Sequence, residues 1–305
     1  MAARPDDMTS RPRSLRGRIP KGRRPLAGTD APTMRRIIEE AGLELIPMKS
    51  LEGAVQALRP GSRISMTCSP AKSIEVTLDE TERLMALGHT VAPHISARMV
   101  QSNNHLREIV QQLDALEVRE VFVVAGDADP PGIFFDAIEF LDAFLDLDPA
   151  VEHIGYTSYP DSHPLIDSDM LHAALHRKQD MILDSGRTAH VTTQMCFSAD
   201  QIRGWLRAER AAGLTVPVHL GVPGVIDKSK LMTMGMRLGV GTSLRYLSKN
   251  RRAIGRLMTQ HSFQPDHLLR PLAADLEELG IGGVHLFTFN QVDTTEEWRE
   301  KVLDR

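Results

Sequence analysis

The sequence of 305 residues contains 42% hydrophobic and 25% charged residues and has a formal net charge of −4, which excludes a disordered or fibrous chain. It holds no run of about 18 to 20 apolar residues, which a membrane span requires. Its two cysteines are too few for a disulfide framework or a cysteine zinc site, so a reducing, cytoplasmic location is expected.

The charge is distributed unevenly along the chain. Residues 1–30 carry eight basic and three acidic side chains and almost no apolar face, which predicts a disordered basic arm rather than a signal peptide or transit helix. The remaining 28 basic and 37 acidic side chains leave a net charge of −9 on residues 31–305. This acidic body argues against nucleic acid as the main partner, and we expect it to form one folded domain.

From residue 31 onward, short apolar runs alternate with longer amphipathic segments. The runs are typical of strands buried on both faces, and they cover Leu43–Pro47, Arg63–Cys68, Thr90–Ile95, Glu120–Gly126, His153–Ser158, Ala189–Cys196, Val216–Val222 and Val284–Phe289. Helix-like segments between them include Asn103–Glu117, Ile133–Leu147, Ser168–Ser185 and Ser198–Gly213. Eight strands alternating with helices over about 250 residues predict a (β/α)8 barrel, with a doubly wound sheet as the alternative.

The interval between the seventh and eighth runs is long. It holds three helix-like segments, Asp227–Leu238, Leu244–Met258 and Pro265–Leu279. We therefore expect extra helices between the last two strands of the barrel.

In such a barrel the functional residues lie at the carboxyl ends of the strands. Glu44 lies between apolar neighbours in the first run, and a buried carboxylate needs a partner, a proton or a catalytic role. It is therefore a candidate general acid, unless its strand is an exposed edge strand.

Asp127 follows the fourth run in the small-residue segment 126–132, where a ligand could approach. The alternative is a turn in which the aspartates cap the following helix, because such a turn has the same sequence pattern. Gln194 ends the sixth run and offers a donor and an acceptor, which suits a heterocycle's amide edge as well as a structural role.

Two other patterns carry little weight. His172 and His176 lie four residues apart on a predicted helix, but no His-Glu-x-x-His context supports a metal site. Residues 239–243, Gly-Val-Gly-Thr-Ser, could cradle a phosphate, but no strand with a dinucleotide fingerprint precedes them. No metal site is expected from the sequence.

Eight short motifs follow one another at the predicted strand ends or just beyond them. In chain order they are Leu43-Glu44-Leu45-Ile46-Pro47, Ser65-Met66-Thr67, Ala92-Pro93-His94, Gly126-Asp127 with Pro130-Pro131-Gly132, Tyr159-Pro160-Asp161-Ser162-His163-Pro164, Arg177-Lys178, Thr193-Gln194 and His285-Leu286-Phe287-Thr288-Phe289-Asn290. Over residues 42–290 this series resembles the methylenetetrahydrofolate reductase family.

The resemblance implies a (β/α)8 barrel that reduces 5,10-methylenetetrahydrofolate to 5-methyltetrahydrofolate with NAD(P)H, supplying methyl groups for methionine synthesis. It implies that Glu44 is the general acid, that Asp127 binds the pterin amide and tunes charge beside the redox centre, and that Gln194 hydrogen-bonds the substrate. The small-molecule partner would be a tetrahydrofolate derivative. Barrels of this family often associate, which allows for a homo-oligomer.

The positions that contact FAD in the family are matched by Thr67, His94, Tyr159 and Lys178. The arginine that usually precedes the Gly-Asp pair is replaced by Ala125, which cannot supply a charged donor array. This departure predicts that FAD is weakly bound or absent and that hydride passes directly from NAD(P)H. The alternatives are a folate-dependent methyltransferase or demethylase on the same barrel, and a folate-binding protein without catalysis.

Overall fold

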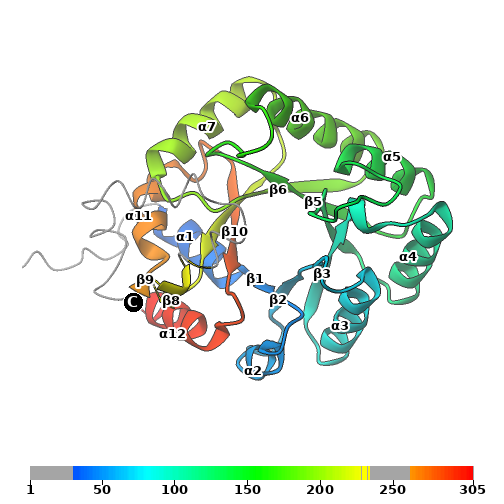
Figure 1. The fold of residues 1–305 in the computed structure, drawn as a ribbon. Helices are drawn as coiled ribbons and strands as arrows, with labels where there is room; N and C mark the ends of the chain where they lie inside the picture. The colour runs from blue at the N-terminus through cyan, green and yellow to red at the C-terminus, as the bar shows by residue number, and fades with distance from the viewer. Residues whose placement is uncertain (1–29, 228, 232, 234–261, 305) are drawn as a thin grey trace, which may run out of the picture.

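The computed structural model of the chain describes residues 30–227, 229–231, 233 and 262–304. Parallel strands close into a barrel in the order β1-β10-β7-β6-β5-β4-β3-β2 (Figure 1). The strands are β1 (Gly42–Leu45), β2 (Arg63–Met66), β3 (Thr90–Ser96), β4 (Glu120–Val124), β5 (His153–Ser158), β6 (Thr188–Thr193), β7 (Val218–Pro223) and β10 (Ile281–Phe287). Closure through the β1–β10 pair confirms the predicted (β/α)8 fold and excludes a doubly wound sheet, which would leave two open edges.

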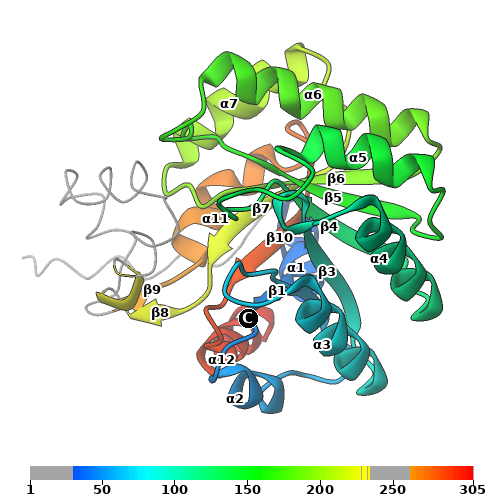
Figure 2. The ribbon, with the colours of Figure 1, turned by 45° about the vertical axis from the view of Figure 1, so that its right-hand side comes forward.

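Helices surround the barrel on the outside (Figures 1 and 2). They are α1 (Asp30–Glu39), α2 (Leu51–Gln56), α3 (Ile74–Ala86), α4 (Asn103–Ala115), α5 (Ala137–Asp146), α6 (Ser168–Asp184), α7 (Ala199–Ala211), α11 (Asp266–Leu272) and α12 (Val292–Leu303), with 3₁₀ turns η1 (Ala97–Met99) and η2 (Ala273–Asp275). The start of α7 follows from its cap, because the Ser198 hydroxyl accepts a hydrogen bond from the backbone N–H of Gln201.

The alternation of side chains along each strand decides which residues face the helices and which face the lumen. In β1, Leu43 and Leu45 are fully buried and belong to the hydrophobic core against the helices. Glu44 lies between them, so its side chain faces the lumen. In β5 the same alternation places Tyr156 toward the helices and both neighbouring residues toward the inside.

A short antiparallel pair, β8 (Ile226–Asp227) and β9 (Ser262–Phe263), lies outside the barrel between β7 and β10 (Figure 2). The sequence did not predict this pair. Of the three expected extra helices, Pro265–Leu279 is represented by α11 and η2. The expected helix Leu244–Met258 lies outside the described residues, as does Asp227–Leu238 apart from residues 227, 229–231 and 233. The expected basic arm lies outside them too, except for its last residue, Asp30. In the described part of the chain, every helix is too short or too polar to cross a membrane.

Candidate active site

Glu44 lies near the carboxyl end of β1, where its residue is 9% exposed. Its carboxylate Oε2 is 3.1 Å from Nε2 of His285, which is also buried and lies on β10. The two residues are 241 positions apart and meet only because β1 and β10 close the barrel. The structure thus confirms that Glu44 is a buried carboxylate with a partner, rather than an exposed residue of an edge strand.

The segment that follows β10 holds the end of β1 in place. The Thr288 hydroxyl donates to the backbone oxygen of Glu44 at 2.5 Å. The Asn290 side chain accepts from the backbone N–H of Ile46 and donates to its carbonyl oxygen, both at 2.9 Å. The motif 285–290, on β10 and just after it, therefore contacts Glu44 and the residues that follow it on the neighbouring strand. Sequence reasoning gave His285 no role, although its position in the motif was visible.

Asp127 follows β4 in a loop that packs closely on the end of β3. Gly126 has a φ of +84°, and a Cβ there would lie 1.8 Å from the Ser96 hydroxyl, so only glycine fits without displacing that side chain. The Arg98 guanidinium donates to the carbonyl oxygen of Ala128 at 2.8 Å and fixes the loop further. Asp127 is exposed at the carboxyl end of the barrel, and Asp136, rather than Asp127, caps the following helix.

Asp127 acts electrostatically on two aromatic side chains of the loop after β5. Burial raises the pKa of the Tyr159 hydroxyl, a hydrogen bond with Thr157 partly offsets this, and the negative charge of Asp127 adds to the rise. Burial lowers the pKa of His163, and the Asp127 carboxylate opposes that shift. The rings of Tyr159 and His163 meet edge to face at 5.1 Å. The fourth and fifth strand ends therefore form one polar region.

Gln194 follows β6 and is half-buried. Its backbone N–H donates to the carbonyl oxygen of Ser158 at 2.8 Å, which ties this strand end to that of β5. The side-chain Oε1 accepts a hydrogen bond from the backbone N–H of Met195 at 2.8 Å. The acceptor is therefore already used locally, and the Nε2 donor is the group that Gln194 offers to a ligand.

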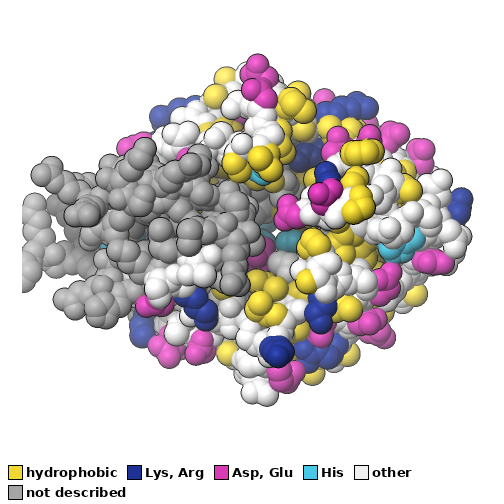
Figure 3. All heavy atoms as spheres, in the orientation of Figure 1, with side chains coloured by type: hydrophobic (Ala, Val, Ile, Leu, Met, Phe, Trp, Pro, Cys, Tyr) yellow, Lys and Arg dark blue, Asp and Glu magenta, His cyan; other side chains and the backbone are white. Residues whose placement is uncertain are grey.

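In the orientation of Figure 1, acidic and histidine side chains gather near the centre of the described part of the surface (Figure 3). The carboxyl ends of β1, β4, β5 and β6 contribute Glu44, Asp127, Tyr159 and Gln194 to this end of the barrel. Since all four are parallel strands of one closed barrel, the residues at their carboxyl ends lie at the same end of it.

The four residues expected to contact a flavin do not form a set that fits it. His94 is buried in the lumen, with its Nε2 2.6 Å from the Ser65 hydroxyl and its ring centroid 4.7 Å from that of Phe122. Lys178 lies on α6 behind β5, where its Nζ donates to the carbonyl oxygen of Thr157 at 3.1 Å. Only Thr67 and Tyr159 remain at strand ends. We derive no step through FAD, and FAD and NAD(P)H binding stay predictions.

Burial also determines the charge state of His94 and Lys178. Burial, followed by the neighbouring His285, lowers the pKa of His94 to about 3, so its imidazole is neutral. Burial lowers the pKa of Lys178 from 10.5 to about 8, and Asp136 opposes the shift. The Lys178 ammonium lies 4.9 Å from the centroid of the Tyr156 ring, which replaces part of its lost hydration.

Because of Lys178, we expect the free energy of unfolding to rise in mildly alkaline solution. Between pH 8 and 10.5 the folded protein loses the Lys178 proton while the unfolded chain keeps it, so the free energy of unfolding increases with pH. The increase is expected to reach about 3 kcal/mol. Urea unfolding at several pH values should show it in the wild type and a flatter curve in Lys178→Met. Parallel curves for the two proteins would contradict this assignment.

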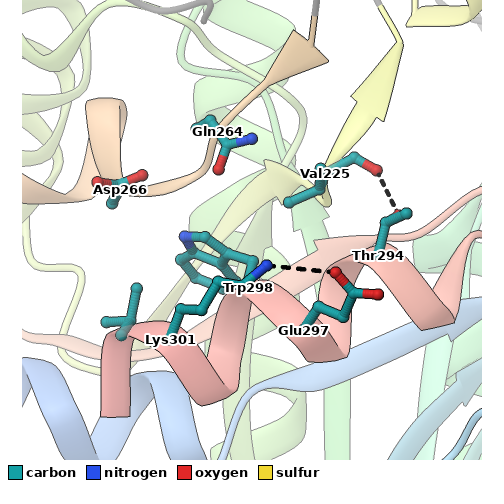
Figure 4. Close-up of a pocket in the computed structure, with 8 residues that line it drawn as sticks. Val225, Gln264, Asp266, Thr294, Glu297, Trp298 and Lys301 are labelled. Atoms are coloured by element: carbon teal, nitrogen blue, oxygen red, sulfur yellow. Dashed lines mark hydrogen bonds and ion pairs between the residues drawn. The ribbon is translucent and has the colours of Figure 1, made fainter. Parts of the chain in front are cut away.

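A cavity of about 250 Å³ lies beside α12 (Figure 4). It is lined by Val225, Gln264, Asp266, Thr294, Glu297, Trp298, Lys301 and Val302. Two pairs of its polar groups bind each other: the Thr294 hydroxyl donates to the carbonyl oxygen of Val225 at 3.0 Å, and Lys301 pairs with Glu297 at 3.3 Å. None of the predicted site residues lines this cavity, and it takes no part in the proposed chemistry.

No family model matches the chain. Among solved structures, the chain is similar to a "putative lyase/mutase" from Burkholderia cenocepacia J2315, with 16% identity, coverage of 90% of this chain and 84% of that one, and a TM-score of 0.44. It is also similar to a "putative phosphonomutase" from the same organism, with 10% identity, coverage of 85% and 92%, and a TM-score of 0.44. At these values the activities of those proteins are not transferred to this chain.

The comparisons correct the expected function. Both similar structures are described as lyase or mutase proteins and neither as a folate reductase, which contradicts the predicted reduction of 5,10-methylenetetrahydrofolate. The predicted oxidoreductase class and the role in methionine synthesis are contradicted with it.

Proposed function

We propose that the chain is an enzyme in which Glu44 transfers a proton to or from a small molecule bound at the carboxyl end of the barrel. The observation that carries the proposal is the buried Glu44–His285 pair, whose atoms approach to 3.1 Å. A polar pair buried in this way adds little net stability, because desolvation offsets most of the attraction. A carboxyl group fixed at the catalytic end of a barrel is better suited to proton transfer.

The geometry supports a simple proton path. In the acid direction, the Glu44 carboxyl group gives its proton to a basic atom of the ligand and becomes a carboxylate. His285, with the proton on Nε2, then donates a hydrogen bond to Oε2 and stabilises that charge. In the base direction the same carboxylate accepts a proton from the ligand. The side chains of Thr288 and Asn290 hydrogen-bond to the backbone of Glu44 and Ile46 and keep Glu44 in position throughout, which supplies the fixed geometry that such transfer requires.

The neighbouring polar groups indicate the kind of ligand. The Asp127 carboxylate is an acceptor, and the Gln194 Nε2 is a donor, so a ligand edge with an adjacent donor and acceptor would match both. The amide edge of a heterocycle has this pattern. A tetrahydrofolate derivative, the partner that the sequence resemblance implies, is therefore the ligand we propose to test first. Kinship with that family is part of the same proposal, and no reduction is included in it.

Binding of tetrahydrofolate to the purified chain tests the ligand contacts. We expect Asp127→Asn to weaken binding by about 10- to 100-fold, because a hydrogen bond to a charged group is lost. Asp129→Asn is the matched control, since Asp129 lies in the same loop with a side chain that is 90% exposed, and it should change the dissociation constant less than twofold. Calorimetric titration measures both. Equal affinities for the two variants would remove Asp127 from the site, and a wild type that does not bind would overturn the ligand.

A further inference from the structure

The amino end of the barrel contains a second cavity, opposite the proposed active site. It has a volume of about 290 Å³ and is lined mainly by residues in the amino-terminal parts of the strands. Its ionisable lining residues are Glu40, Arg63, Glu120, His153, His190, His219 and His285. Four imidazoles around one cavity are not explained by the proposed reaction, which uses His285 alone.

Three of these residues bring ligand atoms together. Glu120 and His153 are direct register partners on β4 and β5, and His190 lies on the next strand, β6. His153 Nε2 is 2.7 Å from His190 Nδ1, and His190 Nδ1 is 4.0 Å from Glu120 Oε1. One ligand atom from each of the three residues lies within 4.8 Å of those of the other two. Two imidazoles and one carboxylate are a ligand set that Zn²⁺ prefers.

The hydrogen bonds around the cluster assign its protons. The Thr188 hydroxyl donates to the carbonyl oxygen of Glu152 at 3.2 Å, so it accepts from His153 Nδ1–H at 2.8 Å. His153 Nε2 therefore carries a lone pair, and it accepts the Nδ1 proton of His190. This is the tautomer in which one imidazole nitrogen is oriented by an outer partner while the other is ready to bind a metal.

Glu120 is oriented in the same way. Arg63 Nη2 binds Glu120 Oε2 at 3.2 Å, which leaves Oε1 turned toward His190. Carboxylates that bind metals are commonly held by such an outer hydrogen bond. Arg63 thus orients the carboxylate and does not occupy the oxygen that faces the imidazoles.

Packing around the cluster holds the His190 ring in place. The His219 ring stacks on it, with the two ring centroids 4.0 Å apart. The His190 ring fits because residue 155 is glycine: a Cβ there would lie 2.5 Å from its Cε1 atom.

We propose that Glu120, His153 and His190 form a binding site for a divalent transition-metal cation of the Zn²⁺ class. On binding, the cation takes the place of the proton between the two rings: His190 changes tautomer, so that its Nδ1 proton is released to solvent and Nε2 takes up a proton from solvent, and both imidazoles stay neutral. The two nitrogens must then separate from 2.7 Å to about 3.3 Å, the spacing of ligands around tetrahedral zinc. The cavity leaves the fourth position for a water molecule. The three strands supply a rigid frame for this site.

The chain offers an internal comparison on its outer surface. His172 Nδ1 and His176 Nε2, both on α6, lie 2.8 and 2.9 Å from Oε2 of Glu209 on α7. This cluster has the same ligand types, but the His172 side chain is 49% exposed and no outer hydrogen bond orients either ring in the described part of the chain. The amino-end cluster is therefore the better organised of the two.

Calorimetric titration of Zn²⁺ into chelator-treated protein tests the site, with Co²⁺ absorption as the readout of imidazole coordination. We expect one tight equivalent in the wild type. His153→Asn should weaken it by at least about 100-fold, and Thr188→Val, which removes only the outer partner, by about 10-fold. His176→Asn should leave affinity and spectrum unchanged. Circular dichroism and thermal melting without metal show whether each variant is folded. If a variant does not fold, Glu120→Gln is titrated in its place.

Three results would overturn the proposal. The first is a wild type that binds neither cation below 1 mM, a threshold on the order of the weakest useful affinities. The second is unchanged binding in His153→Asn, Glu120→Gln and Thr188→Val. The third is loss of the tight equivalent in His176→Asn, which would place the cation at the outer cluster instead.

Discussion

Glu44→Gln is expected to slow the catalysed reaction by a factor on the order of 10² to 10⁴ while ligand affinity stays within a few-fold. Glutamine has the shape of glutamate and can still accept a hydrogen bond from His285, so the barrel end should keep its structure. It cannot give or take a proton at neutral pH. The loss therefore falls on the reaction rate and not on binding, as expected for an interaction made in the transition state.

The measurement is turnover of small molecules followed by proton NMR in D₂O, starting with tetrahydrofolate derivatives. Proton transfer shows itself there as deuterium uptake or conversion that requires the protein. Glu52→Gln is the matched control, because its side chain is 66% exposed on α2 and pairs with Arg83 outside the barrel. Conversion by Glu44→Gln at the wild-type rate would refute the proposed function, whichever ligand is turned over.

Gly221→Ala is expected to be strongly destabilising and to displace Gln194 in the candidate site. Gly221 lies in β7, and a Cβ there would be 1.9 Å from the carbonyl oxygen of Thr193 and 2.7 Å from the Phe287 ring. The backbone of β6 would have to move, and with it Gln194, which follows Thr193 directly. Overpacking of this kind costs about 1–3 kcal/mol or more. The hydrogen bond from the Gly221 N–H to the Thr193 hydroxyl, 2.9 Å long, would be strained as well.

Urea unfolding gives the change in the free energy of unfolding. Gly42→Ala is the control, because Gly42 also lies in a barrel strand but a Cβ there would meet no atom within 4 Å. That variant should differ from the wild type by less than about 1 kcal/mol, the scale of the glycine-to-alanine difference in chain entropy. Equal stability of Gly221→Ala and Gly42→Ala would show that β6 and β7 approach less closely than described.

Much of the fold could be predicted because each element carries its own local signal. The apolar run 153–158 coincides with β5, and the segment predicted as a helix over Ser168–Ser185 is α6 within one residue. The β8–β9 pair was missed because two-residue strands have no periodicity to detect.

The candidate site, too, could be predicted only in part. Glu44 could be identified because an acid between leucines in a buried strand is unusual whatever surrounds it. Lys178 could not be placed from its motif, because a helix residue can turn toward a strand or toward a mouth with no change in sequence. The structure shows it bound behind β5.

The sequence alone determined the order of strands and helices, the acidic body and the carboxylate in the first strand, since these depend on residue type and local spacing. Only the tertiary structure decided which distant residues meet. His285 reaches Glu44 across 241 positions, and the cluster of Glu120, His153 and His190 forms across three strands, because closure of the barrel sets their register. Register between distant strands is a property of the whole sheet, and no local pattern encodes it.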